Sequence, residues 1–188
     1  MKRTIFCLLH AALICLVVPS TVFGASLAGV TLPDEADVGG KSLVLNGLGL
    51  REATFFKVDV YVAGLYLEQK SNNAREIVAS QGTKLLDMKF VRDVDKEKLT
   101  EAWIEGFQKN SVKYGRLKDR VAQLNSMMSD VEDGSTMRFI FNTETVEVFI
   151  AGEKKGSIEG RDFVEGMLSV WLGKHPPNEE LKEGLLGK

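Results

Sequence analysis

Two side chains suited to holding an oxygen atom stand ten residues apart in GLGLREATFFKVDVYVAGLYLE, residues 47–68. Arg51 carries a planar guanidinium with several hydrogen-bond donors, and Tyr61 carries a hydroxyl. We expect Arg51 to lie in a glycine-broken loop and Tyr61 in a strand, with a turn between them that folds the arginine back. The pair would then present a forked donor and a single donor to one oxygen. This predicts a binding site for a ligand with an anionic or carbonyl group.

The segment 55–68 is the longest strand candidate, because it is rich in Phe, Val and Tyr. Successive side chains of a strand point to opposite faces. One predicted face is a plain core face and holds Phe56, Val58, Val60, Val62 and Tyr66. The other face begins polar and ends apolar, and it holds Lys57, Asp59, Tyr61, Ala63 and Leu65. This second face predicts a strand that runs from a solvated or ligand-lined region into the interior.

A second interpretation of the same charges needs no ligand. Lys57 and Asp59 lie two residues apart on one strand face, where they can form a solvated surface pair. Arg51 can bridge the neighbouring Glu52 or the helix pair. Composition and spacing alone leave both interpretations open.

The first 24 residues have the three parts of a secretory signal. Lys2 and Arg3 precede an apolar run over 4–18, and Pro19 and small residues follow it. The alternative is an uncleaved anchor, but this run is shorter than the ~18 apolar residues that a membrane span needs. We predict a signal peptide over 1–24 and one mature domain over 25–188, exported to a bacterial periplasm with no membrane span left after processing.

Loss of the signal would remove both cysteines, Cys7 and Cys15, and one of the two histidines, His10. A chain with no thiol and only His175 excludes disulfides, a cysteine nucleophile and a Cys/His zinc site. His175 stands in the turn GKHPPNEE, which is poorly placed for a serine triad. We therefore expect no metal ion and no cofactor.

The charge balance of the mature chain excludes another class of function. Removal of Lys2 and Arg3 leaves 22 basic residues against 26 acidic ones, a formal charge of −4. A mildly acidic chain without a basic stripe argues against nucleic-acid binding.

Periodicity predicts the elements that position these residues. Short strands around Val30–Leu32 and 43–45 flank the turn DVGG, and a short helix over 72–80 is capped by Asn73. There follow a strand over 85–92, two helices over 95–111 and 116–130, and a three-strand meander over 135–160. The chain ends in two helices over 161–175 and 178–188. Trp103 and Trp171 lie in apolar helical stripes and are assigned to the core. The order of elements predicts an α+β domain, with a mostly antiparallel sheet and helices packed on one face.

Four stretches together resemble the chalcone isomerase-like family, in its exported bacterial branch. They are GLGLRE, VYVAGLYLE, VRDVDKEKLTEAWIEGFQKN and MLSVWLGKHPPNEELKEGLLGK, in this order over nearly all of the mature chain. The resemblance implies the open-faced β-sandwich of that family, with a ligand cleft between a large antiparallel sheet and its helices. It also implies two activities: plant members cyclise chalcones to flavanones, and others bind fatty acids with an arginine and a tyrosine.

The resemblance carries over to single positions as follows. Arg51 matches the family arginine, and Tyr61 falls where the plant enzymes have a threonine. The catalytic tyrosine is absent, with Asp95 or a neighbour in its place, and the helix asparagine becomes Ala102. The threonine or serine that the family enzymes have before the core of the last long helix is replaced here by Val164. Loss of these donors removes most of the electrostatic preorganisation that the cyclisation needs.

Three hypotheses follow. The leading one is a non-catalytic periplasmic protein that binds a small apolar or aromatic acid, fatty-acid-like, through Arg51 and Tyr61. The second is an isomerase of chalcone-isomerase type, an intramolecular lyase in which Arg51 activates the carbonyl of an unknown enone. The third is a structural or partner-binding protein of the envelope, which a closed cleft around Arg51 would favour. Membership of a fold alone does not choose among them.

Overall fold

The computed structural model describes residues 24–53 and 57–188. The strands are β1 (Gly24–Leu27), β2 (Val30–Pro33), β3 (Glu35–Val38), β4 (Lys41–Ala53), β5 (Val58–Leu67), β6 (Lys84–Phe90), β7 (Thr136–Phe141), β8 (Thr145–Ile150) and β9 (Glu153–Glu159). The helices are α1 (Ala74–Ala79), α2 (Lys96–Asn110), α3 (Tyr114–Ser126), α4 (Arg161–Leu172) and α5 (Glu179–Leu185). None of the helices in these ranges is long and apolar enough to span a membrane.

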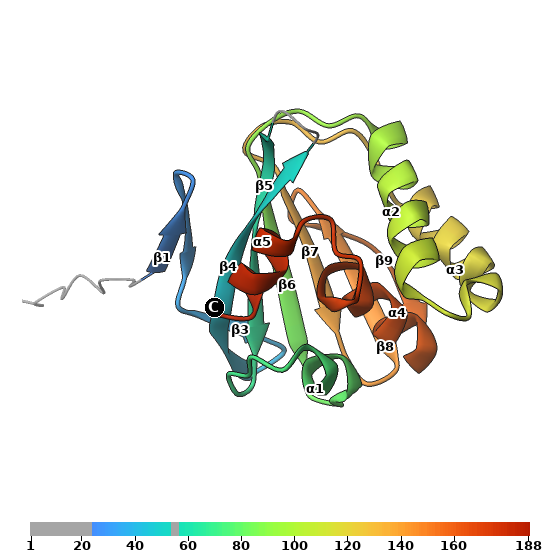
Figure 1. The fold of residues 1–188 in the computed structure, drawn as a ribbon, viewed down its shortest axis with the longest axis horizontal. Coiled ribbons are helices and arrows are strands. Elements are labelled where there is room, and N and C mark those ends of the chain that lie inside the picture. The colour runs from blue at the N-terminus through green and yellow to red at the C-terminus, as the bar shows by residue number, and fades with distance from the viewer. Residues whose placement is uncertain (1–23, 54–56) are drawn as a thin grey trace, which may run out of the picture.

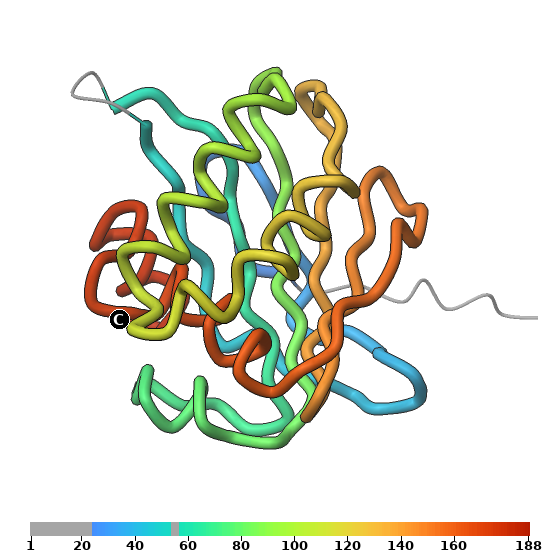
Figure 2. Tube along the Cα trace, turned by 90° about the vertical axis from the view of Figure 1, so that its right-hand side faces the viewer, coloured from blue at the N-terminus to red at the C-terminus, as the bar shows by residue number. Residues whose placement is uncertain are grey.

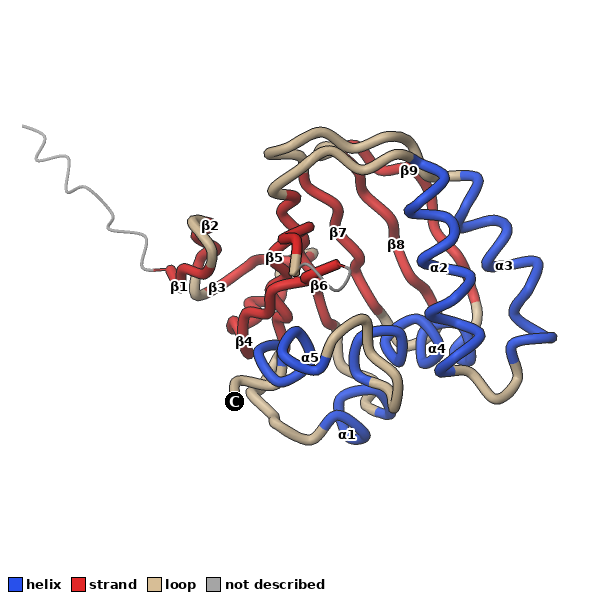
Figure 3. The backbone as a smooth tube through the Cα atoms, turned by 45° about the horizontal axis from the view of Figure 1, so that its top comes forward, coloured by secondary structure: helices blue, strands red, loops and turns tan. Residues whose placement is uncertain are grey.

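Strands β3 to β9 form one seven-stranded antiparallel sheet in sequence order. The sheet curves around the helices, which lie on one of its sides, while the β1–β2 hairpin lies on the other (Figures 1 and 3). In the view of Figure 2, α2 and α3 cross in front of the strands. The main core fills the space between the sheet and the helices, and a smaller cluster around Leu43, Tyr66 and Leu85 lies on the opposite side of the sheet. The predicted α+β architecture with helices on one face is confirmed.

The helical periodicities predicted from the sequence are confirmed. Asn73 caps α1 by accepting hydrogen bonds from the backbone N–H groups of Arg75 and Glu76. In α2 the buried side chains are Leu99, Trp103 and Phe107, spaced four residues apart. That spacing places them on one side of the helix, which is the side that faces the sheet.

The opening of the domain differs from the prediction. Val30 and Leu32 belong to β2, which pairs with β1 and not with the strand that follows DVGG. The turn DVGG joins β3 to β4, and Gly39 and Gly40 have φ angles of 60° and 81°. These left-handed angles suit glycine in a tight hairpin turn.

The sequence suggested a loop at GLGLRE, but the segment is part of the 13-residue strand β4. Its glycines serve a close approach of α5. A Cβ atom added at Gly47 would meet backbone atoms of Gly184 and Gly187, and one at Gly49 would meet the backbone of Leu181. Glycine is the residue that lets two backbones approach this closely. Strand β4 therefore holds both the predicted arginine and the seat of the last helix.

A β-bulge in β5 corrects the predicted strand faces. Arg51 pairs with Tyr61 across the ladder, but the next pair is Glu52 with Asp59, so Val60 is an extra residue. A bulge re-aims neighbouring side chains. Val58 and Val60 therefore share a cavity wall with Tyr61, although strict alternation assigns them to opposite faces. The predicted Phe56 lies outside the described residues.

The rest of β5 matches the predicted pattern in part. Ala63 and Leu65 continue from Tyr61 into the main core, as the polar-to-apolar face predicted. Tyr66 is buried in the smaller cluster on the other side of the sheet. The strand face that was predicted to be a plain core face therefore packs into the smaller of the two cores. Its hydroxyl donates to the backbone oxygen of Pro33 at 2.9 Å, which ties β2 to the sheet.

Candidate functional site

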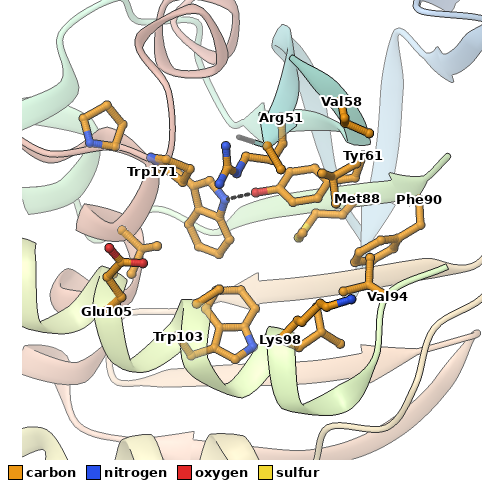
Figure 4. Close-up of a pocket in the computed structure, with 18 of the residues that line it drawn as sticks. Arg51, Val58, Tyr61, Met88, Phe90, Val94, Lys98, Trp103, Glu105 and Trp171 are labelled. Carbon is orange, nitrogen blue, oxygen red and sulfur yellow. Dashed lines mark hydrogen bonds between the residues drawn. The ribbon is translucent and has the colours of Figure 1, made fainter. Parts of the chain in front are cut away.

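A cavity of about 530 Å³ lies between α2, the end of α4 and strands β4, β5 and β6. Figure 4 shows the side chains that line it. They include Arg51, Ala53, Val58, Val60, Tyr61, Met88, Phe90, Val94, Leu99, Ala102, Trp103, Val170 and Trp171. A concave, mostly apolar site of this volume with a few polar groups is typical of small-molecule binding.

The structure brings Arg51 and Tyr61 together across a reversal of the chain, as predicted, but Arg51 lies in strand β4 and not in a loop. The two residues are direct partners in the β4–β5 ladder, so their side chains leave the same face of the sheet. Both line the cavity, and Figure 4 shows the guanidinium beside the tyrosine hydroxyl. Arg51 and Tyr61 therefore form a polar end of the cavity, made by neighbouring strands, next to apolar side chains of its wall.

The guanidinium of Arg51 keeps donors for a ligand. One of its terminal nitrogens donates to the backbone oxygen of Glu52, and among the described residues Arg51 forms no ion pair. The carboxylate of Glu52 lies 3.8 Å from the ammonium of Lys57 instead. Lys57 and Asp59 are exposed, as the surface interpretation predicted, but Lys57 pairs with Glu52 and not with Asp59. The half-buried Arg51 thus carries a charge that no carboxylate of the described residues pairs with.

Tyr61 is held on two sides. The indole nitrogen of Trp171 donates to its hydroxyl oxygen at 3.1 Å, and its ring meets that of Phe90 edge-on at 5.6 Å. Only 8% of Tyr61 is exposed. Burial raises the pKa of the Tyr61 hydroxyl above its ordinary value, and the Trp171 hydrogen bond and the positive charge of Arg51 offset part of that rise. The hydroxyl is therefore protonated at neutral pH.

Trp171 is the site residue that sequence reasoning missed. Its ring is 1% exposed and packs edge-on against Trp103 at 5.4 Å, so both tryptophans belong to the core as predicted. They also line the cavity. The signal that could have singled out Trp171 is its N–H, because a buried indole nitrogen usually finds an acceptor.

Charged side chains stand at the edge of the cavity. Lys98 pairs with Asp95 at 3.0 Å and Lys109 pairs with Glu105 at 2.5 Å, both within α2. These exposed pairs contribute little to stability. His175 also lines the cavity, and its backbone N–H and oxygen are both bonded to the amide of Asn110. Among the described residues, no group of three or more His, Cys, Asp and Glu side chains could hold a metal ion.

Of Asp95, Ala102 and Val164, which stand at the positions that correspond to the enzyme's other catalytic residues, only Ala102 lines the cavity in the structure. Ala102 lines the cavity and presents a methyl group where the plant enzymes are expected to have an amide. Val164 is buried in α4 and is not among the residues that line the cavity. Asp95 precedes α2 and binds Lys98 instead of lining the cavity.

Comparison with known proteins decides the family. The sequence model described as chalcone isomerase-like matches residues 24–187. The protein belongs to the chalcone isomerase-like family. Among solved structures, this family member is similar to the crystal structure of a fatty-acid binding protein from Arabidopsis thaliana, with a TM-score of 0.69 and 16% sequence identity. The similarity covers 84% of this chain and 92% of the plant chain, which shows the shared fold. No match is found among curated proteins.

Proposed function

We propose that this chalcone isomerase-like protein binds a small, largely apolar ligand with one carboxylate or carbonyl group, such as a fatty acid, and does not catalyse a reaction on it. One observation carries the proposal: Arg51 and Tyr61, direct partners in the β4–β5 ladder, form the polar end of a mostly apolar cavity. A guanidinium and a phenol hydroxyl match the two oxygens of a carboxylate.

Affinity and orientation would come from different parts of the site. Apolar side chains such as Phe90, Leu99 and Trp103 would take up the hydrocarbon part, at about 25 cal/mol for each Å² removed from water. Arg51 would fix the head group through charge-assisted hydrogen bonds, which are worth roughly 1.5–3 kcal/mol each. The name of the similar plant structure, a fatty-acid binding protein, supports the same class of ligand.

Two further observations support binding without catalysis. The methyl group of Ala102 offers no hydrogen bond to a reacting carbonyl, although it lies in the cavity wall. Arg51 is half-buried and not sealed, which favours a ligand site over a purely structural role. A preorganised set of donors is the largest contribution to catalysis of this kind, and the cavity offers few of them.

The proposal is tested by titrating dodecanoic acid into the purified protein by calorimetry, and by native mass spectrometry of protein purified without refolding. We expect saturable binding at one site. Arg51→Met should weaken it roughly 10- to 100-fold, because it removes the charged guanidinium but keeps an unbranched side chain. Arg92→Met is the matched control, since Arg92 lines the same cavity but does not belong to the β4–β5 ladder that pairs Arg51 with Tyr61, and it should change affinity less than threefold.

Two results would contradict the proposal. A folded protein that binds no fatty acid and carries no co-purified small molecule would refute ligand binding. Turnover of a chalcone above the rate in buffer, lost in Arg51→Met, would refute the non-catalytic part and favour the isomerase.

We also propose that the protein acts in a bacterial periplasm after removal of residues 1–24. The support is the signal-like order of Lys2 and Arg3, an apolar run and small residues. The N-terminal sequence of protein recovered from an expressing bacterium, together with its cell fraction, tests this. A chain that keeps Met1 in the cytoplasmic fraction would contradict it.

A further inference from the structure

The hydrogen bond between Trp171 and Tyr61 joins the end of α4 to the middle of β5 across 110 residues of sequence. Its direction is fixed by chemistry. An indole N–H can only donate, so the Tyr61 oxygen accepts, and the hydroxyl proton of Tyr61 is directed elsewhere. Among the described residues, the Tyr61 hydroxyl donates no hydrogen bond. Tyr61 lines the cavity, so its proton is available to a group bound there.

We propose that Trp171 is a positioning residue that holds Tyr61 as a hydrogen-bond donor and thereby selects ligands whose head group only accepts. This inference rests on the proposed ligand-binding function. With the tyrosine oxygen occupied by Trp171, Arg51 and Tyr61 both act as donors in this part of the cavity. The carboxylates elsewhere in its wall, Asp93 and Glu105, are bonded to the backbone N–H of Asp133 and to Lys109. Carboxylates, ketones and esters satisfy such a site completely.

An alcohol of the same shape satisfies the site only in part. Its oxygen can accept from Tyr61 or Arg51, but its own proton needs an acceptor, and the best candidate, the Tyr61 oxygen, is taken by Trp171. A buried donor left without a partner lowers affinity by about tenfold. Discrimination by hydrogen-bond direction is stronger than discrimination by shape, because it leaves a polar group unpaired.

A neutral pair of ligands isolates this effect from charge. We choose 2-dodecanone and 2-dodecanol, which have the same chain and differ only at the oxygen, and measure both affinities by competition with a fluorescent fatty acid. The wild-type protein should prefer the ketone about tenfold. Trp171→Phe removes the N–H but keeps an aromatic ring, which frees the Tyr61 oxygen to accept from the alcohol. The preference should then fall below threefold.

Trp103→Phe is the matched control. Trp103 lines the same cavity, and its N–H donates to the sulfur of Met128 at 3.3 Å and not to Tyr61. This variant should keep the tenfold preference even if it weakens both ligands. A purely structural role for Trp171 would likewise weaken both ligands alike and leave their ratio unchanged, which would overturn the inference.

Tyr61→Phe supplies a second test that does not depend on the stability of the Trp171 variant. It removes the oxygen that Trp171→Phe is proposed to free, so the alcohol proton still has no acceptor and the ketone preference should persist. In that background Trp171→Phe should no longer lower the preference, because there is no tyrosine oxygen left to free, as expected for two residues that act as one unit.

The outcomes separate this inference from the proposed function. If wild-type protein binds dodecanoic acid but does not distinguish the ketone from the alcohol, the inference is wrong and the ligand-binding function stands. If Tyr61→Phe abolishes the wild-type preference, the inference is also wrong. If wild-type protein binds neither the acid nor the ketone, both proposals fail together.

Discussion

The contact between α5 and β4 makes Gly49→Ala the most informative single change in the scaffold. A Cβ atom at this position would meet the backbone carbonyl of Leu181 and lie 2.8 Å from its Cδ1. A side chain can rotate away, but the backbone of a helix cannot. The substitution therefore has to push α5 off the strand.

The cost follows from what α5 holds. Leu181 and Leu185 are fully buried, and the amide of Asn46 donates to the backbone oxygen of Leu185 at 2.8 Å. Overpacking of this kind costs about 1–3 kcal/mol, and loosening the hydrogen bond adds about 1 kcal/mol. We expect Gly49→Ala to lower the free energy of unfolding by about 2–4 kcal/mol. That is a large share of the 5–15 kcal/mol that stabilises a typical domain.

Urea unfolding followed by tryptophan fluorescence measures this change, and hydrogen exchange locates it. Amides of α5 should lose protection before those of the central strands, because the strain acts on the helix. Gly115→Ala is the matched control: Gly115 lies within α3, and a Cβ atom there meets nothing within 4 Å. It should raise stability by up to about 1 kcal/mol through helix propensity. A Gly49→Ala protein within 0.5 kcal/mol of wild type would refute the reasoning.

Two further predictions concern the cavity and a buried amine. Ala102→Trp should weaken dodecanoic acid binding more than tenfold by filling the cavity, with little change in the melting temperature, because Ala102 is an exposed residue of α2. Burial lowers the pKa of Lys84 to about 8, from 10.5, so the unfolded chain binds the proton more tightly than the folded one. Relative to Lys84→Met, wild-type stability should therefore rise between about pH 8 and 10.5, by at most about 3 kcal/mol, in urea titrations across that range.

The helices could be predicted because their signal is local. The spacing of Leu99, Trp103 and Phe107 describes one side of α2 without reference to any other segment, and the structure buries that side. The meander of β7 to β9 was predictable for the same reason, since each strand alternates and each turn is short.

The strand faces near the site could not be derived in full because a bulge belongs to two strands. Val60 is an extra residue only relative to its partner strand β4, so the sequence of β5 alone does not predict the bulge. The glycines of β4 were assigned to a loop for a related reason. Gly47 and Gly49 are needed because α5, about 130 residues later in the chain, packs against them. The local sequence shows only that these two positions have no side chain.

The positions of Arg51 and Tyr61 at the polar end of the cavity depend on contacts that link β4 to β5, β5 to α4, and α5 back to β4. Strand β4 carries Arg51, which pairs with Tyr61, which accepts from Trp171 near the end of α4. The residues after α4 include Pro176, which lines the cavity, and lead into α5, which packs back on the glycines of β4. Displacing α5 should therefore disturb the Trp171 hydrogen bond as well as stability. On this reasoning Gly49→Ala reduces the ketone preference over the alcohol, whereas Gly115→Ala leaves it unchanged.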